Sequence, residues 1–116
     1  MRILSVILLL LLTSQVQAAN MRWMKNSPAS YFTDSDWDIF GKTLRETLGN
    51  GADGVTVNWV NPETDHRGSI TPLENIAVKD QSCRKVRFIS VTPKASGRVD
   101  AVLCPGEGDK WLIHSR

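Results

Sequence analysis

The chain has 116 residues and carries 14 Lys and Arg against 12 Asp and Glu. This near balance of charge excludes the strongly basic surface that is typical of proteins that bind nucleic acid through its phosphates. The length suits one domain with a modest core, so we expect a single cooperative unit.

Residues 1–18 have the pattern of a cleavable secretory signal. Arg2 is the positive start, an apolar run follows from Ile3 to Leu12, and Val16-Gln17-Ala18 ends in small residues. The alternative is a membrane-spanning helix, which needs about twenty apolar residues, roughly twice the run present. We therefore expect cleavage after Ala18, no lipid anchor there because no cysteine is near, and a mature chain that is periplasmic or secreted.

The next segment, residues 19–32, has no sustained periodicity and is predicted to be a flexible arm. A helix is predicted to follow this segment, with Thr33 or Ser35 as its N-cap and Gly49 as its stop. Asp34, Asp36 and Asp38 then serve as favourable charges at the positive end of the helix dipole. An apolar stripe recurs at spacings of three and four along it: Trp37, Phe40, Leu44 and Leu48.

Five segments with strand character follow the helix, separated by turn residues. They cover 55–59, 68–78, 83–91, 98–104 and 110–114. The order of elements predicts an α+β domain over residues 33–116. In this fold, one N-terminal helix packs on an antiparallel meander sheet of about four to five strands.

The two cysteines, Cys83 and Cys104, are expected to form one disulfide, because an exported chain meets an oxidising compartment. Two free thiols are the alternative. If the cysteines lie opposite each other in a hairpin, apolar and oppositely charged residues also face one another, including Phe88 with Val99 and Arg87 with Asp100. That register directs one set of side chains at the helix: Val86, Phe88, Val99, Ala101 and Leu103.

The segment from Trp59 to Pro72 reads WVNPETDHRGSITP. It resembles the W-x-N-P-x-T-G-x-x-G-x-[IV]-x-P segment of the bacterial surface-antigen domain, the C-terminal domain of the seventeen-kilodalton outer-membrane surface antigens. The Cys83-Arg84 pair, Cys104 and the Gly108-Asp109-Lys110-Trp111 segment agree with the order of motifs in that family. The resemblance covers about residues 36–116.

This resemblance implies an envelope protein with an α+β fold and no established activity. Members often carry a lipid-anchoring cysteine and a glycine zipper before the domain, and this chain has neither. Asp65 also stands where the family usually has glycine. Free periplasmic residence is therefore favoured over attachment to the outer membrane, although association with that membrane remains compatible with the resemblance.

No combination of nucleophile, base and orienting group is recognisable, and the two histidines, His66 and His114, lie outside any metal-binding spacing. We predict no catalytic residue, metal or cofactor. A non-enzymatic binding or structural module is favoured, and a small secreted enzyme or enzyme inhibitor is the alternative. The candidate binding residues are Trp59, Asn61, Arg67, Thr71 and Arg84.

The Trp59 to Pro72 segment concentrates aromatic, amide, hydroxyl and cationic groups, which favours a recognition loop. The structural alternative is that it only forms turns between two strands, with Trp59 in the core and Arg84 holding carbonyl groups at the sheet edge. The expected partner is an envelope protein or a cell-wall component rather than nucleic acid. The sequence does not predict the oligomeric state.

Overall fold

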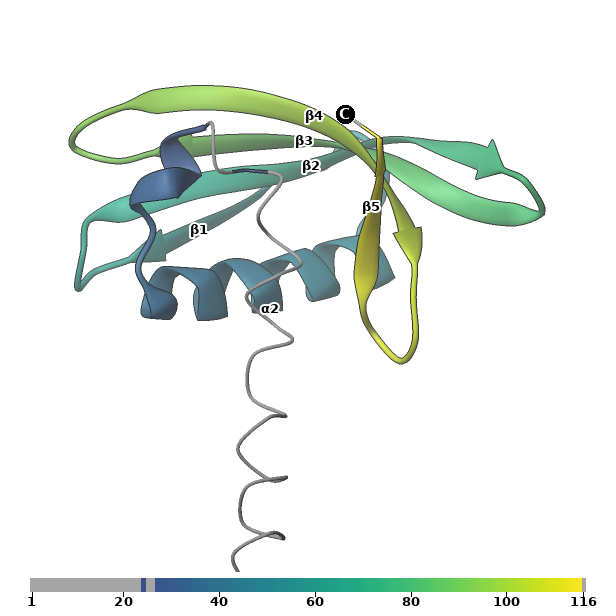
Figure 1. Cartoon of the computed structure of the whole chain (residues 1–116), viewed down its shortest axis with the longest axis horizontal. Helices are drawn as coiled ribbons and strands as arrows, with labels where there is room; N and C mark the ends of the chain where they lie inside the picture. Colours follow the sequence, from purple (N-terminus) through teal and green to yellow (C-terminus); the bar gives the residue numbers. More distant parts are fainter. Residues whose placement is uncertain (1–23, 25–26, 116) are drawn as a thin grey trace, which may run out of the picture.

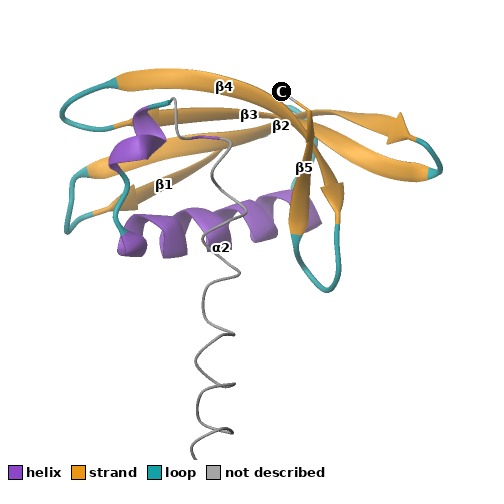
Figure 2. Cartoon of the chain, in the orientation of Figure 1, coloured by secondary structure: helices purple, strands orange, loops and turns teal. Residues whose placement is uncertain are grey.

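The computed structural model describes residue 24 and residues 27–115, so the predicted signal lies outside the described residues. The predicted fold class is confirmed: in the described residues, one α-helix precedes a five-stranded antiparallel meander sheet with strand order β1-β2-β3-β4-β5. The elements are the 3-10 helix η3 (Pro28–Tyr31), α2 (Asp34–Asn50), β1 (Val57–Asn61), β2 (His66–Val78), β3 (Gln81–Val91), β4 (Ser96–Pro105) and β5 (Trp111–Ser115). Both helices lie on the same face of the sheet (Figures 1 and 2).

Helix α2 begins with a capping box. The Thr33 side chain accepts a hydrogen bond from the Asp36 backbone N–H, and the Asp36 carboxylate accepts one from the Thr33 backbone N–H. The helix ends one residue later than the predicted stop, because Gly49 remains helical and Gly51 caps the end by donating to the Thr47 carbonyl at 2.7 Å. Glycine lowers helix propensity without forbidding the helix, so the hydrogen bond decides where it ends.

The β3–β4 hairpin has the predicted register. Val86 faces Ala101, Arg87 faces Asp100 and Phe88 faces Val99. Cys83 and Cys104 form the expected disulfide, with their Cα atoms 4.3 Å apart. Arg87 also donates two hydrogen bonds to Asp100, at 3.1 and 3.2 Å, so the cross-strand ion pair forms as expected.

The core lies between α2 and the sheet face that the register predicted. Phe40 and Phe88 meet there, with ring centroids 5.6 Å apart, and both are buried. Most of the remaining predicted positions are also buried: Leu44, Leu48, Val86, Ala101 and Leu103. Trp37 packs against this cluster while half-buried, and Val99 is also half-buried.

The described part of the predicted arm is packed rather than loose. Ser27 caps η3, and Ala29 in that helix is buried, as is Met24 before it. Phe32 then contacts Trp37 and Trp59 edge to face, with both centroid distances 5.1 Å. These contacts have no periodic signature, since a single turn and a few separated side chains make them. Residues 27–32 thus pack against the domain, in the segment for which the sequence predicts a flexible arm.

Strand β2 is long and contains one irregularity. The pairing with β3 shifts between Pro72 and Glu74. Proline has no backbone N–H to contribute to a ladder, so a bulge at this point lets the strand continue to Val78.

Candidate functional site

A buried carboxylate joins α2 to the β1–β2 hairpin. Asp36 occupies the third position of the helix and its side chain has no exposed surface. One of its oxygens, Oδ2, accepts hydrogen bonds from the Thr33 backbone N–H at 2.7 Å and from the Thr33 hydroxyl at 3.1 Å. The helix start thus supplies two of the donors that compensate a buried charge.

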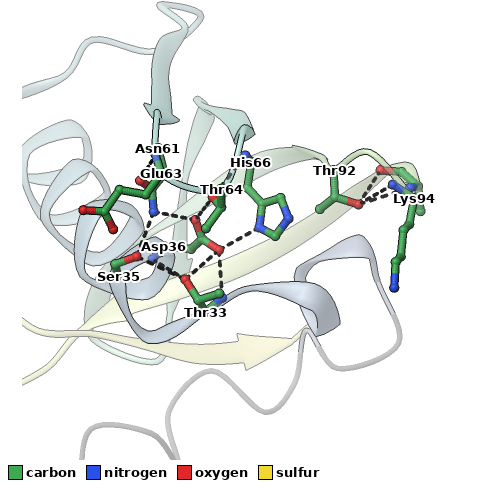
Figure 3. A network of polar contacts seen from close by, with 10 residues as sticks. Thr33, Ser35, Asp36, Asn61, Glu63, Thr64, His66, Thr92 and Lys94 are labelled. Carbon is green, nitrogen blue, oxygen red and sulfur yellow. Dashed lines mark hydrogen bonds and ion pairs between the residues drawn. The ribbon is translucent and has the colours of Figure 1, made fainter.

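Three side chains of the hairpin supply the other donors (Figure 3). Asn61 Nδ2 and Thr64 Oγ1 donate to Oδ1 of Asp36, at 2.8 and 2.7 Å. His66 Nδ1 lies 2.7 Å from Oδ2 and is the donor in this contact, because an ionised carboxylate only accepts. We call Asp36, Thr33, Asn61, Thr64 and His66 the Asp36 cluster. It links residues that are 25 to 30 positions apart.

These contacts keep Asp36 ionised. Burial has the largest single influence and by itself raises the pKa of this carboxyl group. The hydrogen bonds from the Thr33 backbone, Thr64, His66 and Asn61 together outweigh burial and lower the pKa from 3.8 to about 2. The cluster thus stabilises the charged form of Asp36. At neutral pH its hydrogen bonds hold the start of α2 against the β1–β2 hairpin.

His66 is the one group of the cluster with an obvious chemical use. Its imidazole stacks on Phe32, with centroids 5.9 Å apart, and its side chain is 13% exposed. A carboxylate at Nδ1 orients an imidazole as in hydrolase triads, but a nucleophile must then meet the other nitrogen. Among the described residues, no hydroxyl or thiol hydrogen-bonds to that nitrogen, and no group of three potential metal ligands occurs.

His66 is the first residue of β2, and its side chain contacts Asp36 at the start of the helix. The sequence predicts no such contact. For Asp36 the sequence predicts only a favourable interaction with the helix dipole and not the contacts with the hairpin. The Thr33-x-x-Asp36 spacing could have indicated the capping box, but no local signal indicates which hairpin lies against it.

Two predicted binding residues belong to the interior. Trp59 is buried in the core, and its Nε1 has no hydrogen-bond partner among the described residues. Asn61 is buried in the Asp36 cluster, where Nδ2 also reaches the Ser35 hydroxyl at 2.9 Å. Its Oδ1 accepts from the Glu63 backbone N–H at 3.1 Å and shapes the turn. The structural alternative considered for these two residues therefore describes their contacts.

Arg67 and Thr71 lie on the other face of the sheet, which we call the open face. Arg67 is exposed and sits between Val60 and Val91 of the neighbouring strands. Thr71 is opposite Arg87, and its hydroxyl is 2.8 Å from that of Thr56. These two residues are separated from Trp59 and Asn61 by the thickness of the sheet, so the five predicted residues do not form one site.

Arg84 lies at the opposite end of α2 from Asp36. Its Nη1 donates to the Leu48 carbonyl at 3.0 Å and its Nη2 to Asp53 at 2.6 Å. The guanidinium therefore binds the last turn of the helix and the turn that follows it, where a cation also complements the helix dipole. The contact with the Leu48 carbonyl agrees with the structural alternative for Arg84, in which its guanidinium holds carbonyl groups.

An open groove lies between the β2–β3 turn and the edge strand β5. Val78, Gln81, Cys104, Leu112 and His114 are among the residues that line it. Leu112 is 45% exposed, so the groove leaves apolar surface in contact with solvent. His114 is exposed here and far along the chain from the Asp36 cluster.

Comparisons with protein-family models, with curated proteins and with solved structures found no match. Within residues 24 and 27–115, no helix is both long enough and apolar enough to cross a membrane.

Proposed function

We propose that this protein is an exported component of the cell envelope, of the surface-antigen type, and that its domain is a non-enzymatic binding or structural module. The observation that carries the proposal is that both carboxylate oxygens of Asp36 are occupied by hydrogen bonds from within the protein. Five donors occupy the carboxylate, and their side chains fix the helix to the hairpin. A carboxylate committed in this way has little capacity left to exchange protons with a substrate.

Two further observations support export. The pattern of residues 1–18 is that of a secretory signal. The Cys83–Cys104 disulfide is typical of proteins that fold in an oxidising compartment. Because α2 and η3 cover one sheet face, the open face and the sheet edges are the surfaces that remain for an envelope protein or cell-wall partner.

A second candidate, a small secreted enzyme, is favoured by one contact only. The 2.7 Å contact between Asp36 and His66 orients the imidazole as a general base requires. A His66→Gln variant separates the two proposals, because the amide of Gln can still donate to Asp36 but cannot act as a base. The binding-module proposal expects association with isolated envelopes to survive this change, whereas loss of a measurable activity with the fold intact would favour the enzyme.

Export is tested on the full chain expressed with its native signal. Mass spectrometry of the exported fraction should show an N-terminus at Ala19 or Asn20, no attached lipid, and an oxidised cysteine pair. A Leu8→Arg and Leu10→Arg variant, in which charges interrupt the apolar run, serves as the control and should stay unprocessed. An exported chain that keeps Met1, or a native chain with two reactive thiols, would contradict the proposal.

A further inference from the structure

The open face carries more positive than negative side chains. Strand alternation and the observed registers place four cations on it, namely Arg67, Lys85, Arg87 and Arg98. The same registers place only Glu74 and Asp100 there as anions. The formal excess on this face is therefore two positive charges, while the whole chain carries +2.

Three of the four cations lie near one carboxylate, that of Asp100. Arg87 donates two hydrogen bonds to Asp100, and Arg98 approaches the same group at 3.9 Å. The pKa of Asp100 is lowered by its hydrogen bonds with Arg87 and, less strongly, by the charges of Arg87, Arg98 and Lys85. One carboxylate thus faces several cations, and Arg98 keeps 60% of its side chain exposed.

Aliphatic side chains lie between these cations. Val60 is 55% exposed and Ile89 is 39% exposed, and both share the open face with Arg67 and Arg98. Val60 is directly opposite Arg67, and Ile89 is directly opposite Arg98. Each exposed aliphatic group is therefore next to a guanidinium whose stem can lie along it while the charge reaches outward.

The shape of this face decides which kind of anionic partner fits. It is the broad side of a sheet, with no described element over it (Figure 1). The groove between the β2–β3 turn and β5 is lined instead by other residues, and it includes none of the four cations. A broad face that combines cations with short aliphatic side chains matches the headgroup region of a bilayer better than it matches an extended chain held in a cleft.

We propose that the open face docks on an anionic lipid surface, with Arg67, Lys85 and Arg98 facing lipid phosphates and with Val60 and Ile89 at headgroup depth. Such docking is peripheral and reversible, because a small cationic excess and two aliphatic side chains give no anchor. Glu63 and Asp65 occupy the β1–β2 turn at one end of the face, so the positive field is centred on β3 and β4. The inference rests on the proposed envelope location and names the surface that the domain meets there.

The test is sedimentation of the oxidised protein, purified from the exporting cell, with phosphatidylcholine vesicles that contain or lack an equal part of phosphatidylglycerol. We expect binding to the anionic vesicles only, with release at high salt because exposed charges are screened. The Arg67→Gln and Arg98→Gln double variant should bind about tenfold more weakly or worse, since each cation near an anionic surface contributes several-fold.

A matched control removes the same charge elsewhere. Lys42 is on the exposed side of α2, and Lys110 is in the β4–β5 turn. This turn lies near the helix, because Asp109 forms an ion pair with Arg45 of α2. The Lys42→Gln and Lys110→Gln double variant should keep most of the binding. A Val60→Thr and Ile89→Thr double variant leaves the charge unchanged and should weaken binding.

Three results would overturn the inference. These are equal sedimentation with neutral and anionic vesicles, equal losses in the two charge variants, and binding to soluble polyglutamate without binding to vesicles. A processed, oxidised and exported chain that ignores anionic vesicles overturns the lipid docking alone and leaves the proposed envelope function standing. Failure of export itself, seen as an intact Met1, overturns the proposed function instead.

Discussion

The carboxylate of Asp36 accepts hydrogen bonds from two separate segments of the chain. Substitution at this position therefore tests the contact between α2 and the β1–β2 hairpin. In an Asp36→Asn variant, one oxygen becomes an amide that faces the Thr33 or hairpin donors, and the buried charge is lost. We expect a loss of about 2 to 4 kcal/mol in the free energy of unfolding, measured in urea. Asp38→Asn, at an exposed position of the same helix, should cost under about 0.5 kcal/mol. Equal costs would contradict a role for the cluster.

The pKa of Asp36 also predicts how stability depends on pH. Folding lowers this pKa from 3.8 to about 2, so between these values the unfolded chain binds more protons than the folded one. The stabilisation is therefore fully present above about pH 4 and is lost as the pH falls toward 2, by roughly 2 kcal/mol in all. Urea titrations at a series of pH values should show this slope in the wild type. The Asp36→Asn variant should lack this component, and an unchanged slope would show that other carboxyl groups cause it.

The Asp36 cluster could be predicted from the sequence only in part. Asp36 at a helix start and Asn61 and Thr64 in a turn are each predictable from local preferences. The contact between Asp36 and His66 spans 30 positions and depends on how the helix crosses the sheet, which no local pattern specifies. The binding role predicted for Asn61 has the same cause. The sequence around an amide in a polar turn does not differ between an amide that faces solvent and one that faces a buried carboxylate.

At the scale of elements, substitutions of two neighbouring residues of β3 test which face of the strand is buried. Phe88 packs on Phe40 in the core, whereas Ile89 is 39% exposed on the open face. Phe88→Ala should cost about 3 to 5 kcal/mol in the free energy of unfolding, as for other buried aromatic residues. Ile89→Ala should cost under about 1 kcal/mol. The reverse order would mean that the strand is shifted by one residue and that the open face has been assigned to the wrong side chains.

The end of α2 depends on Arg84. An Arg84→Met variant keeps an apolar stem but removes the donors to the Leu48 carbonyl and to Asp53. We expect a cost of about 1 to 3 kcal/mol, because a half-buried carbonyl and a carboxylate lose their partner. Hydrogen exchange should quicken at the last turn of α2 and not at its first turn, near Asp36. Lys85→Met, on the opposite face, is the control, and similar exchange in both variants would contradict the assignment.

Several elements were predictable because their signals are local or covalently fixed. The register of residues 83–104 follows from two cysteines and strict alternation, and the structure confirms it. The apolar stripe predicts the helix, but Gly49 as a stop predicts an end one residue before the observed last residue, Asn50. The packing of η3 and Phe32 was missed, since such contacts depend on tertiary neighbours and not on periodicity.

At the scale of the whole molecule, the arrangement divides the surface into two unlike sides. The helices cover one sheet face, and the Asp36 cluster and Arg84 fasten the two ends of α2 to the strands and turns around it. The other face keeps four cations and two exposed aliphatic residues accessible. Contacts on the covered side therefore stabilise the fold, and the open face is the side that we propose meets the envelope.

Photocross-linking in the living cell tests this division most directly. A photoreactive phenylalanine analogue replaces either Ile89 on the open face or Glu46 on the exposed side of α2. We expect adducts with envelope components from position 89 and few or none from position 46, in chains that are exported and oxidised to the same extent. Adducts from position 46 alone, or equal adducts from both positions, would contradict it.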